Sequence, residues 1–373
     1  MHLRDAIKHT RADFAAGNTV IWKGPPGFGK TFGSLELYKA VCTDNPGKRV
    51  GLGRVFMATQ QDVDAFGLPW PGTVEHEGKT FNVTRPLLPG WYMSTEGLPA
   101  SCYDIFLLIM EEWGQGGAEA KKAFASVMLE KGVPGYYLPE GSHILALTNV
   151  DAADGITKEF DFVIGRRKEY TITGDVKVWD EDFASHPYMH GGKVWNVSPL
   201  FRAHAMARPE VFFEAKPKVQ GPWSNPRSQC AVDRYVQVLT EQNGGTVPLG
   251  DAGMMQGMEG GFGMPATQSV LEFAEFQINL PKYEDVVKDP DGTPVPQSAD
   301  QLMLMAYGLA ARTLPDDLSP CIKYAQKLGK SMAVTYAQSL LRRDYAGVVH
   351  HPAMQAWISK NAALLTAVGG AKA

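Results

Sequence analysis

The sequence predicts an α/β fold, with a parallel, helix-covered sheet in its first half and a mainly helical second half. Three observations support this prediction. A compact β-branched strand at 19–23 runs through a glycine-rich loop into a helical pattern from about 31 to 41. A continuous apolar run at 105–110 is typical of a central parallel strand that is buried on both faces. Beyond about residue 175, alternating strands and helices give way to helical patterns separated by loops.

The composition is that of a globular protein, because 44% of the 373 residues are hydrophobic and 20% are charged. A chain of this length is too long for one core, so we expect two packed units. The 36 basic and 40 acidic side chains give a net charge of −4. That balance argues against sequence-independent nucleic-acid binding over the whole surface, although a local basic groove remains compatible with it.

The cysteines and the apolar runs indicate the compartment in which the protein is expected to work. The four cysteines lie far apart and form no Cys-x-x-Cys, so they are expected to be reduced thiols: Cys42, Cys102, Cys230 and Cys321. The first residues lack the shape of a signal peptide, and the longest apolar runs are too short to span a bilayer. We therefore expect a cytoplasmic protein without membrane contact.

The remaining elements of the first half follow from periodicity and turn residues. A short helix is predicted up to about residue 17, and a second strand at 49–59. A β-hairpin is predicted at 73–83, with its turn near Glu77-Gly78. After the buried strand come a helix at 118–130 and strands at 136–138 and 143–148.

The second half is predicted as helices with two interruptions. The helical patterns cover 179–185, 229–239, 268–276, 299–313, 320–343 and 353–368. A Gly/Met-rich stretch at 250–264 is predicted to be a mobile loop, with an adaptable partner surface as the alternative. A turn-rich stretch at 289–296 is the other interruption.

The glycine loop after the first strand carries the clearest chemistry. It fits the pattern Gly-x-x-x-x-Gly-Lys-[Ser/Thr], whose backbone N–H groups point at phosphate oxygens beside a helix N-terminus. Lys30 would reach the β- and γ-phosphates, and the Thr31 hydroxyl would bind Mg²⁺. A chance glycine turn is the alternative, which the preceding strand and the following helix disfavour. The predicted phosphate-binding residues are Gly24, Pro25, Pro26, Gly27, Phe28, Gly29, Lys30 and Thr31.

Two later strands end in polar residues that could face this loop. Glu111 and Glu112 follow the buried strand, where the first would orient Mg²⁺ and the second would polarise a water that attacks the γ-phosphate. An ordinary acidic helix cap is the alternative. Asn149 follows the strand at 143–148 and could hydrogen-bond the same water or the phosphate, unless it is a simple turn asparagine.

Together these segments resemble the Walker A, Walker B and sensor 1 motifs of AAA+ ATPases. Four further segments resemble the MoxR-like branch, particularly its bacteriophage versions: 61–69, 136–141, 149–155 and 225–228. The resemblance extends over roughly residues 15–240. It implies a P-loop NTPase (AAA+) fold with an all-α lid and a C-terminal helical extension. The implied domains are a nucleotide-binding domain at 1–175, a connecting segment at 176–222, and a helical lid with C-terminal helices at 223–373.

The resemblance also implies roles for three arginines. Arg166 matches the arginine finger that acts on a neighbouring subunit, with Arg167 as the adjacent candidate and a plain surface cluster as the alternative. Arg227 matches the lid arginine of sensor 2. Hairpins near 73–83 and 132–141 fall where this branch carries a pore-facing insert and a pre-sensor hairpin. Two departures are Glu111, which stands where the family has aspartate, and Gly165, which precedes the finger.

The resulting hypothesis is an ATPase that requires ATP and Mg²⁺ and forms a homo-oligomeric ring, expected to be a hexamer. By resemblance it would act as a chaperone or remodelling factor on a protein partner, with a von Willebrand factor A domain protein as a companion. One alternative is a nucleic-acid motor for phage replication or packaging, which DNA would stimulate. Another is an ATP-gated assembly switch with little hydrolysis, which the departure at Glu111 keeps open. A monomeric P-loop kinase fits less well.

Overall fold

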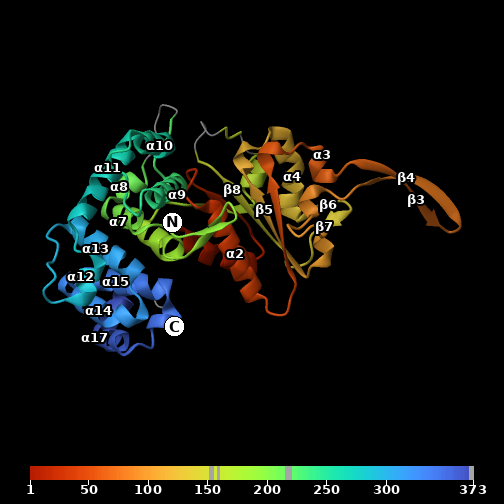
Figure 1. Cartoon of the computed structure of the whole chain (residues 1–373). Helices are drawn as coiled ribbons and strands as arrows, with labels where there is room; N and C mark the ends of the chain where they lie inside the picture. Colours follow the sequence, from red (N-terminus) through yellow and green to blue (C-terminus); the bar gives the residue numbers. More distant parts are fainter. Residues whose placement is uncertain (151–154, 158–159, 215–220, 369–373) are drawn as a thin grey trace. The chain divides into compact units, whose positions relative to one another are not determined.

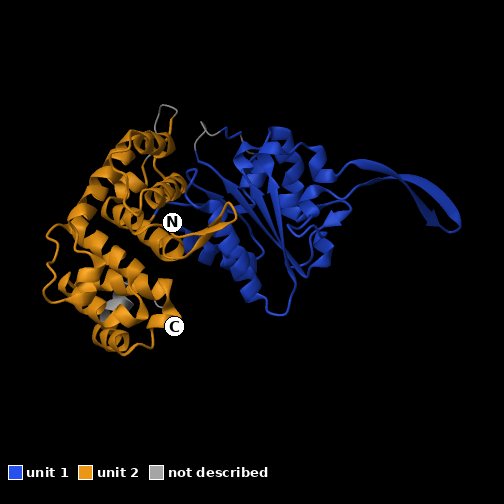
Figure 2. Cartoon of the chain, in the orientation of Figure 1, with its two compact units in different colours: residues 1–174 blue, residues 175–373 orange. Residues whose placement is uncertain are grey.

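The computed structural model describes residues 1–150, 155–157, 160–214 and 221–368 (Figure 1). The chain forms two compact units, residues 1–174 and 175–373 (Figure 2), and each is described by itself. Residues 176–222 belong to the second unit.

The first unit is built on a five-stranded sheet in the order β2-β5-β8-β1-β9. All neighbouring strands in this sheet are parallel. The strands are β1 (Thr19–Lys23), β2 (Val50–Phe56), β5 (Ile105–Glu111), β8 (His143–Thr148) and β9 (Arg167–Thr171). The predicted parallel α/β sheet is confirmed, and β9 is a strand that the sequence did not predict.

Both faces of this sheet are covered, as β5 shows residue by residue. Its odd-numbered residues, such as Leu107, join a core with α1 (Leu3–Ala15) and α2 (Lys30–Asp44). Its even-numbered residues, such as Phe106, join a second core with α4 (Ala118–Glu130). The apolar run at 105–110 is therefore continuous because alternate side chains enter two different cores. The carboxyl ends of the strands meet at one edge.

An antiparallel hairpin extends away from the rest of the first unit (Figure 1). It comprises β3 (Pro69–His76) and β4 (Lys79–Pro86), and is longer than the predicted 73–83. Both turn residues, Glu77 and Gly78, have positive φ angles of 49° and 73°, as a two-residue hairpin turn requires. A shorter hairpin joins β6 (Gly132–Val133) to β7 (Tyr136–Tyr137). This unit also contains two short helices, α3 (Val63–Phe66) and α5 (Asp161–Ile164).

The second unit is mainly helical, with two large hydrophobic cores, a smaller cluster around Phe212, and a small hairpin of β10 (Tyr188–His190) and β11 (Lys193–Trp195). Its first helix, α6 (Val176–Trp179), continues into a π-helical turn at Asp180–Ala184. The other helices are α7 (Pro199–Ala207), α8 (Pro209–Phe212), α9 (Pro226–Gln242), α10 (Ala252–Phe262), α11 (Met264–Glu275), α12 (Tyr283–Lys288), α13 (Ala299–Arg312), α14 (Leu318–Lys327), α15 (Lys330–Arg343), α16 (Tyr345–Val348) and α17 (Pro352–Val368). No helix among the described residues is long and apolar enough to cross a membrane.

Two sequence predictions in this unit are wrong. The stretch at 250–264 is not a mobile loop, because most of it forms α10, which Asp251 caps and which buries Met254, Met258 and Phe262 at four-residue spacing. The predicted single helix at 320–343 is two helices. They are separated at Gly329, whose φ of 96° lies outside the range of an α-helix.

Candidate functional site

The glycine loop joins β1 to α2 at the carboxyl edge of the sheet. Gly27 and Gly29 have φ angles of 81° and 79°, a backbone conformation that other residues adopt only with strain. A Cβ atom on Gly24 would lie 3.0 Å from the carbonyl oxygen of Ile172, so close packing also requires glycine there. Gly29 is the N-cap of α2 and has no side chain to cap the first turn. The N–H groups of that turn therefore suit an anionic ligand.

Lys30, the first residue of α2, folds back over this loop. Its Nζ donates hydrogen bonds to the carbonyl oxygens of Gly24 (2.7 Å) and Pro25 (2.9 Å). The same Nζ donates to Oδ1 of Asn149, at 3.1 Å. Asn149 directly follows β8, which pairs with β1, so the sheet brings together residues 119 positions apart. The ammonium group thus lies where the loop and the end of β8 meet.

Glu111 is the last residue of β5, and its carboxylate is held from two sides. Oε2 accepts a hydrogen bond from the Thr31 hydroxyl at 3.0 Å. Oε1 accepts from Nε and Nη2 of Arg54, at 3.2 and 2.5 Å. The Glu111 side chain is only 7% exposed, so this ion pair is largely buried. Sequence reasoning missed Arg54, which lies inside the strand predicted at 49–59, because its contact with Glu111 depends on the pairing of β2 with β5.

Glu112 differs sharply from its neighbour. It is exposed and adopts a left-handed conformation, with φ of 54° and ψ of 37°. Such a conformation costs of order 1–3 kcal/mol in a non-glycine residue and often occurs at functional sites. The turn therefore buries one of the two adjacent carboxylates and presents the other to solvent.

The turn after Glu112 is held by its neighbours. A Cβ atom on Gly114 would lie 2.2 Å from the Thr148 hydroxyl oxygen, so a larger residue does not fit. Thr157 donates its backbone N–H to the Gly114 carbonyl at 2.9 Å and its hydroxyl to the Gly116 carbonyl at 2.7 Å. The buried Lys121 donates to the Thr157 carbonyl at 2.8 Å. These contacts fix the backbone that positions Glu112.

The predicted arginines lie in different surroundings. Arg166 is exposed, two residues after α5. The Arg167 side chain is only 1% exposed and lies 3.4 Å from Glu169 on β9. Of the two, Arg166 is therefore the one whose side chain reaches the surface. Arg227 is exposed near the start of α9, in the second unit.

The segment around Arg227 has a clear local role. The Asn225 side chain accepts hydrogen bonds from the backbone N–H groups of Arg227 and Ser228, at 3.1 and 3.2 Å, and the Ser228 hydroxyl accepts from the Asn225 N–H at 3.0 Å. This reciprocal capping box explains the Asn-Pro-Arg-Ser sequence as a helix start. In the segment 149–155, residues 151–154 lie outside the described residues.

The oxygen donors at the sheet edge fit a magnesium ion. Mg²⁺ prefers hydroxyl, carboxylate, phosphate and water oxygens, and commonly takes only one or two ligands from the protein. Thr31 and Glu111 supply one hydroxyl and one carboxylate, 3.0 Å apart. Within the described residues there is no group of three or more His, Cys, Asp or Glu that could hold a metal. A metal at this edge would therefore take its remaining ligands from phosphate and water.

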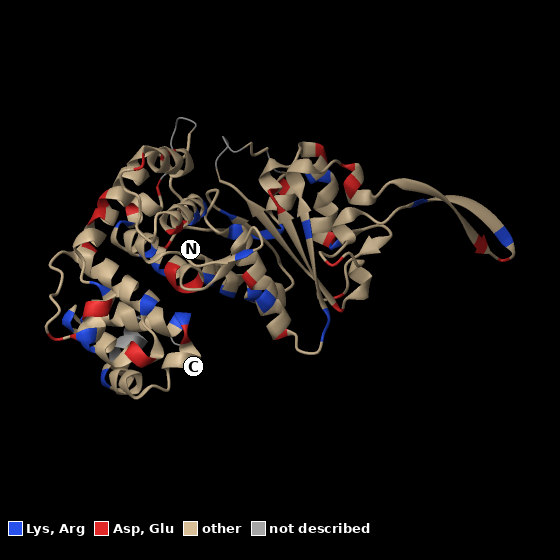
Figure 3. Ribbon diagram, viewed as in Figure 1, with Lys and Arg blue, Asp and Glu red and all other residues tan. Residues whose placement is uncertain are grey.

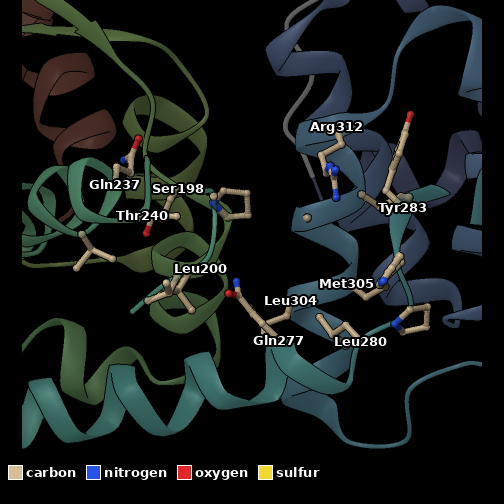
Figure 4. Close-up of a pocket in the computed structure, with 18 of the residues that line it drawn as sticks. Ser198, Leu200, Gln237, Thr240, Gln277, Leu280, Tyr283, Leu304, Met305 and Arg312 are labelled. Atoms are coloured by element: carbon tan, nitrogen blue, oxygen red, sulfur yellow. The ribbon is translucent and has the colours of Figure 1, made fainter. Parts of the chain in front are cut away.

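A separate cavity of about 540 Å³ lies within the second unit (Figure 4). Its lining combines apolar side chains, including Leu200 and Leu304, with the polar Gln237, Gln277 and Arg312. Arg312 also pairs with Glu284 at 3.0 Å. None of the residues predicted for phosphate binding or catalysis lines this cavity.

Comparison with known proteins gives little further information. No family model matches the chain, and no curated protein matches it. A similar solved structure is a protein from Cytophaga hutchinsonii that is described as a candidate ATPase. It shares 14% identity at a TM-score of 0.32, covering 75% of this chain and 90% of the other. A similarity this distant assigns neither family nor activity.

Proposed function

We propose that this protein binds ATP with Mg²⁺ and hydrolyses it. The observation that carries the proposal is the convergence of three separate segments on one edge of the sheet. Thr31 of the glycine loop bonds to Glu111 at the end of β5, and Lys30 bonds to Asn149 after β8. Phosphate-binding loops, acidic strand ends and a polar residue between them form the arrangement expected for phosphoryl transfer to water.

Each residue has a distinct role in this proposal. The N–H groups of the Gly24–Thr31 loop and the Lys30 ammonium group hold the triphosphate, and Thr31 with Glu111 holds the metal. Bound Mg²⁺ supplies neutralisation of the phosphate charge. Glu112, exposed and fixed by its turn, orients the attacking water and accepts its proton. Asn149 hydrogen-bonds the water or the γ-phosphate.

We further propose a ring of identical subunits, a hexamer, of the MoxR-like type found in bacteriophages. The exposed Arg166 suits a finger that completes the site of the adjacent subunit, and Arg227 would report nucleotide state to the lid. The exposed Trp70 and Phe81 of the β3–β4 hairpin are suited to contacting a protein client. A von Willebrand factor A domain protein is the expected companion, and the host cytoplasm the expected location.

A nucleic-acid motor is the second candidate, and the charge distribution does not favour it. Lys and Arg are interspersed with Asp and Glu over both units in Figure 3. DNA stimulation of ATP hydrolysis, weakening steeply with salt, would support this candidate instead.

Single-turnover hydrolysis of ATP tests the catalytic assignment. Glu112→Gln is expected to bind ATP normally and to hydrolyse it about 10²–10⁴-fold more slowly than wild type, because a general base is lost. Glu119→Gln, which changes an exposed glutamate in the first turn of α4, is the matched control and should hydrolyse at the wild-type rate.

The other outcomes separate the alternatives. If Glu112→Gln turns over at the wild-type rate, Glu112 is not the base. If wild type binds ATP and assembles without measurable hydrolysis, the protein is an ATP-gated switch. Electron microscopy with a slowly hydrolysed ATP analogue would show whether a ring forms and whether Arg166 reaches the neighbouring phosphate.

A further inference from the structure

The buried pair of Glu111 and Arg54 has a feature that phosphate binding alone does not explain. Arg54 directs two N–H groups, from Nε and Nη2, to a single carboxylate oxygen, Oε1. The other oxygen, Oε2, is left to the Thr31 hydroxyl. The carboxylate is therefore divided between an internal cation and the residue that begins the nucleotide site.

The position of Arg54 follows from strand pairing. Residue 54 lies beside Ile109 in the parallel register of β2 and β5, and Phe56 lies beside Glu111. The guanidinium group lies 5.4 Å from the ring centre of Phe56, and the side chain is 29% exposed. It thus approaches Glu111 from the adjacent strand, while Thr31 approaches from α2.

Two physical needs are met by this contact. A buried carboxylate without a partner is costly, so Arg54 compensates the Glu111 charge when no metal is bound. Glutamate also has one more rotatable bond than aspartate, and the guanidinium contact restricts that extra freedom. The contact therefore suits a site in which the acidic residue is glutamate.

We propose that Arg54 is a positioning residue that sets the Mg²⁺ dependence of nucleotide binding; this rests on the proposed function. Arg54 holds Oε2 of Glu111 toward Thr31 and neutralises the carboxylate in the empty site. Metal-free ATP is then not repelled by the Glu111 carboxylate, because Arg54 compensates its charge. A metal ion that binds Glu111 must compete with the Arg54 guanidinium group for its charge.

Loss of Arg54 should weaken the binding of ATP without metal and increase the effect of Mg²⁺ on ATP binding. In Arg54→Met the uncompensated carboxylate repels metal-free ATP, so affinity in EDTA falls. The same carboxylate attracts Mg²⁺ more strongly, so the metal restores more of the affinity. The ratio of ATP affinity with Mg²⁺ to that in EDTA is expected to rise at least about tenfold. A general structural defect would instead lower both affinities alike.

The experiment is a titration of ATP into the full chain, with Mg²⁺ and with EDTA. Arg54→Lys keeps the charge but loses the pair of hydrogen bonds to Oε1 of Glu111. Its ratio of ATP affinity with Mg²⁺ to that in EDTA should therefore lie between those of wild type and Arg54→Met. Arg49→Met is the matched control, because Arg49 lies just before β2, is 54% exposed, and comes no closer than 4.0 Å to Glu96. It should show the wild-type ratio.

Thermal unfolding without nucleotide tests whether the Arg54 variant is folded. Arg54→Met should lower the thermal unfolding temperature, and adding Glu111→Gln should recover part of that loss because the unpaired charge is gone. If wild type binds no ATP under either condition, the proposed function fails and this inference fails with it. If wild type binds ATP but Arg54→Met keeps the wild-type ratio, only the inference is overturned.

Discussion

Two carboxylate–arginine pairs, one in each unit, show how similar contacts serve different ends. In the second unit, Arg202 on α7 donates to both oxygens of Asp180, at 2.7 and 3.2 Å. Tyr307 donates to Asp180 at 3.0 Å, and Arg342 lies 3.9 Å away. The Asp180 and Arg202 side chains are 6% and 10% exposed.

The pair of Glu111 and Arg54 in the first unit has fewer protein donors around its carboxylate. Glu111 has Arg54 on one oxygen and the Thr31 hydroxyl on the other, and Arg54 is 29% exposed. The Asp180 cluster surrounds its carboxylate with protein donors, so we interpret it as structural. The Glu111 cluster stands beside the glycine loop of the proposed nucleotide site, where we propose that its carboxylate exchanges a protein partner for a metal ion. The comparison teaches that the two carboxylates differ in how completely protein donors surround them, more than in their distances to arginine, and this difference separates the structural interpretation of Asp180 from the function proposed for Glu111.

The largest expected effect comes from breaking the complete cluster. Arg202→Met leaves the Asp180 charge buried with weakened compensation, so the free energy of unfolding should fall by about 3–5 kcal/mol. ATP affinity should not change at temperatures where the variant is folded. Urea denaturation followed by circular dichroism measures the first, and ATP titration the second.

The control for Arg202→Met is an exposed pair. Arg11 and Asp44 lie 2.5 Å apart with side chains 41% and 37% exposed. Arg11→Met should cost no more than about 1 kcal/mol, because solvent screens such pairs. A larger loss for Arg11→Met than for Arg202→Met would contradict the role assigned to burial.

A smaller effect is expected from the buried Asp233 on α9, whose pKa burial raises to about 6. It accepts hydrogen bonds from the Ser198 N–H and from Gln237 Nε2, both at 2.9 Å. The folded pKa exceeds the unfolded value of 3.8, so its stabilising contribution is complete below about pH 4 and is lost as pH rises through about 6.

The permanently neutral Asp233→Asn should remove this loss. Relative to wild type, its free energy of unfolding should rise by about 1–3 kcal/mol between pH 4 and pH 7. Burial lowers the pKa of His204 to about 3, so its contribution to the free energy of unfolding is lost as pH falls. Because wild type and Asp233→Asn both contain His204, this contribution cancels when the two proteins are compared. Parallel stability curves for the two proteins would show that Asp233 does not titrate in this range.

Local pattern was enough to predict much of the first unit. The strand at 19–23 and the helix at 118–130 have the predicted bounds, because strand, loop and helix signals there agree. The positions of Lys30, Glu111 and Asn149 at one edge follow from parallel strands ending together. Their catalytic roles remain predictions.

The features that sequence missed depend on distant pairing or on competing signals. Arg54 contacts Glu111 across 57 positions through strand register, which local pattern does not reveal. The Arg167 side chain is buried on β9, a strand that local pattern did not predict. The helix at 252–262 was missed because its glycine content was taken to indicate a loop. The four-residue spacing of its buried side chains is a helical pattern that the sequence does contain.

The most direct test of the central claim is the affinity for ATP with Mg²⁺ of wild type, Lys30→Ala and Lys39→Ala, measured by calorimetry. Lys30 begins α2 at the proposed phosphate site, whereas Lys39 lies on the same helix with its side chain 71% exposed. The account predicts one ATP per chain for wild type, unchanged binding for Lys39→Ala, and about 10–100-fold weaker binding for Lys30→Ala. Equal affinities for all three proteins, or no binding by wild type, would contradict a nucleotide site at this loop.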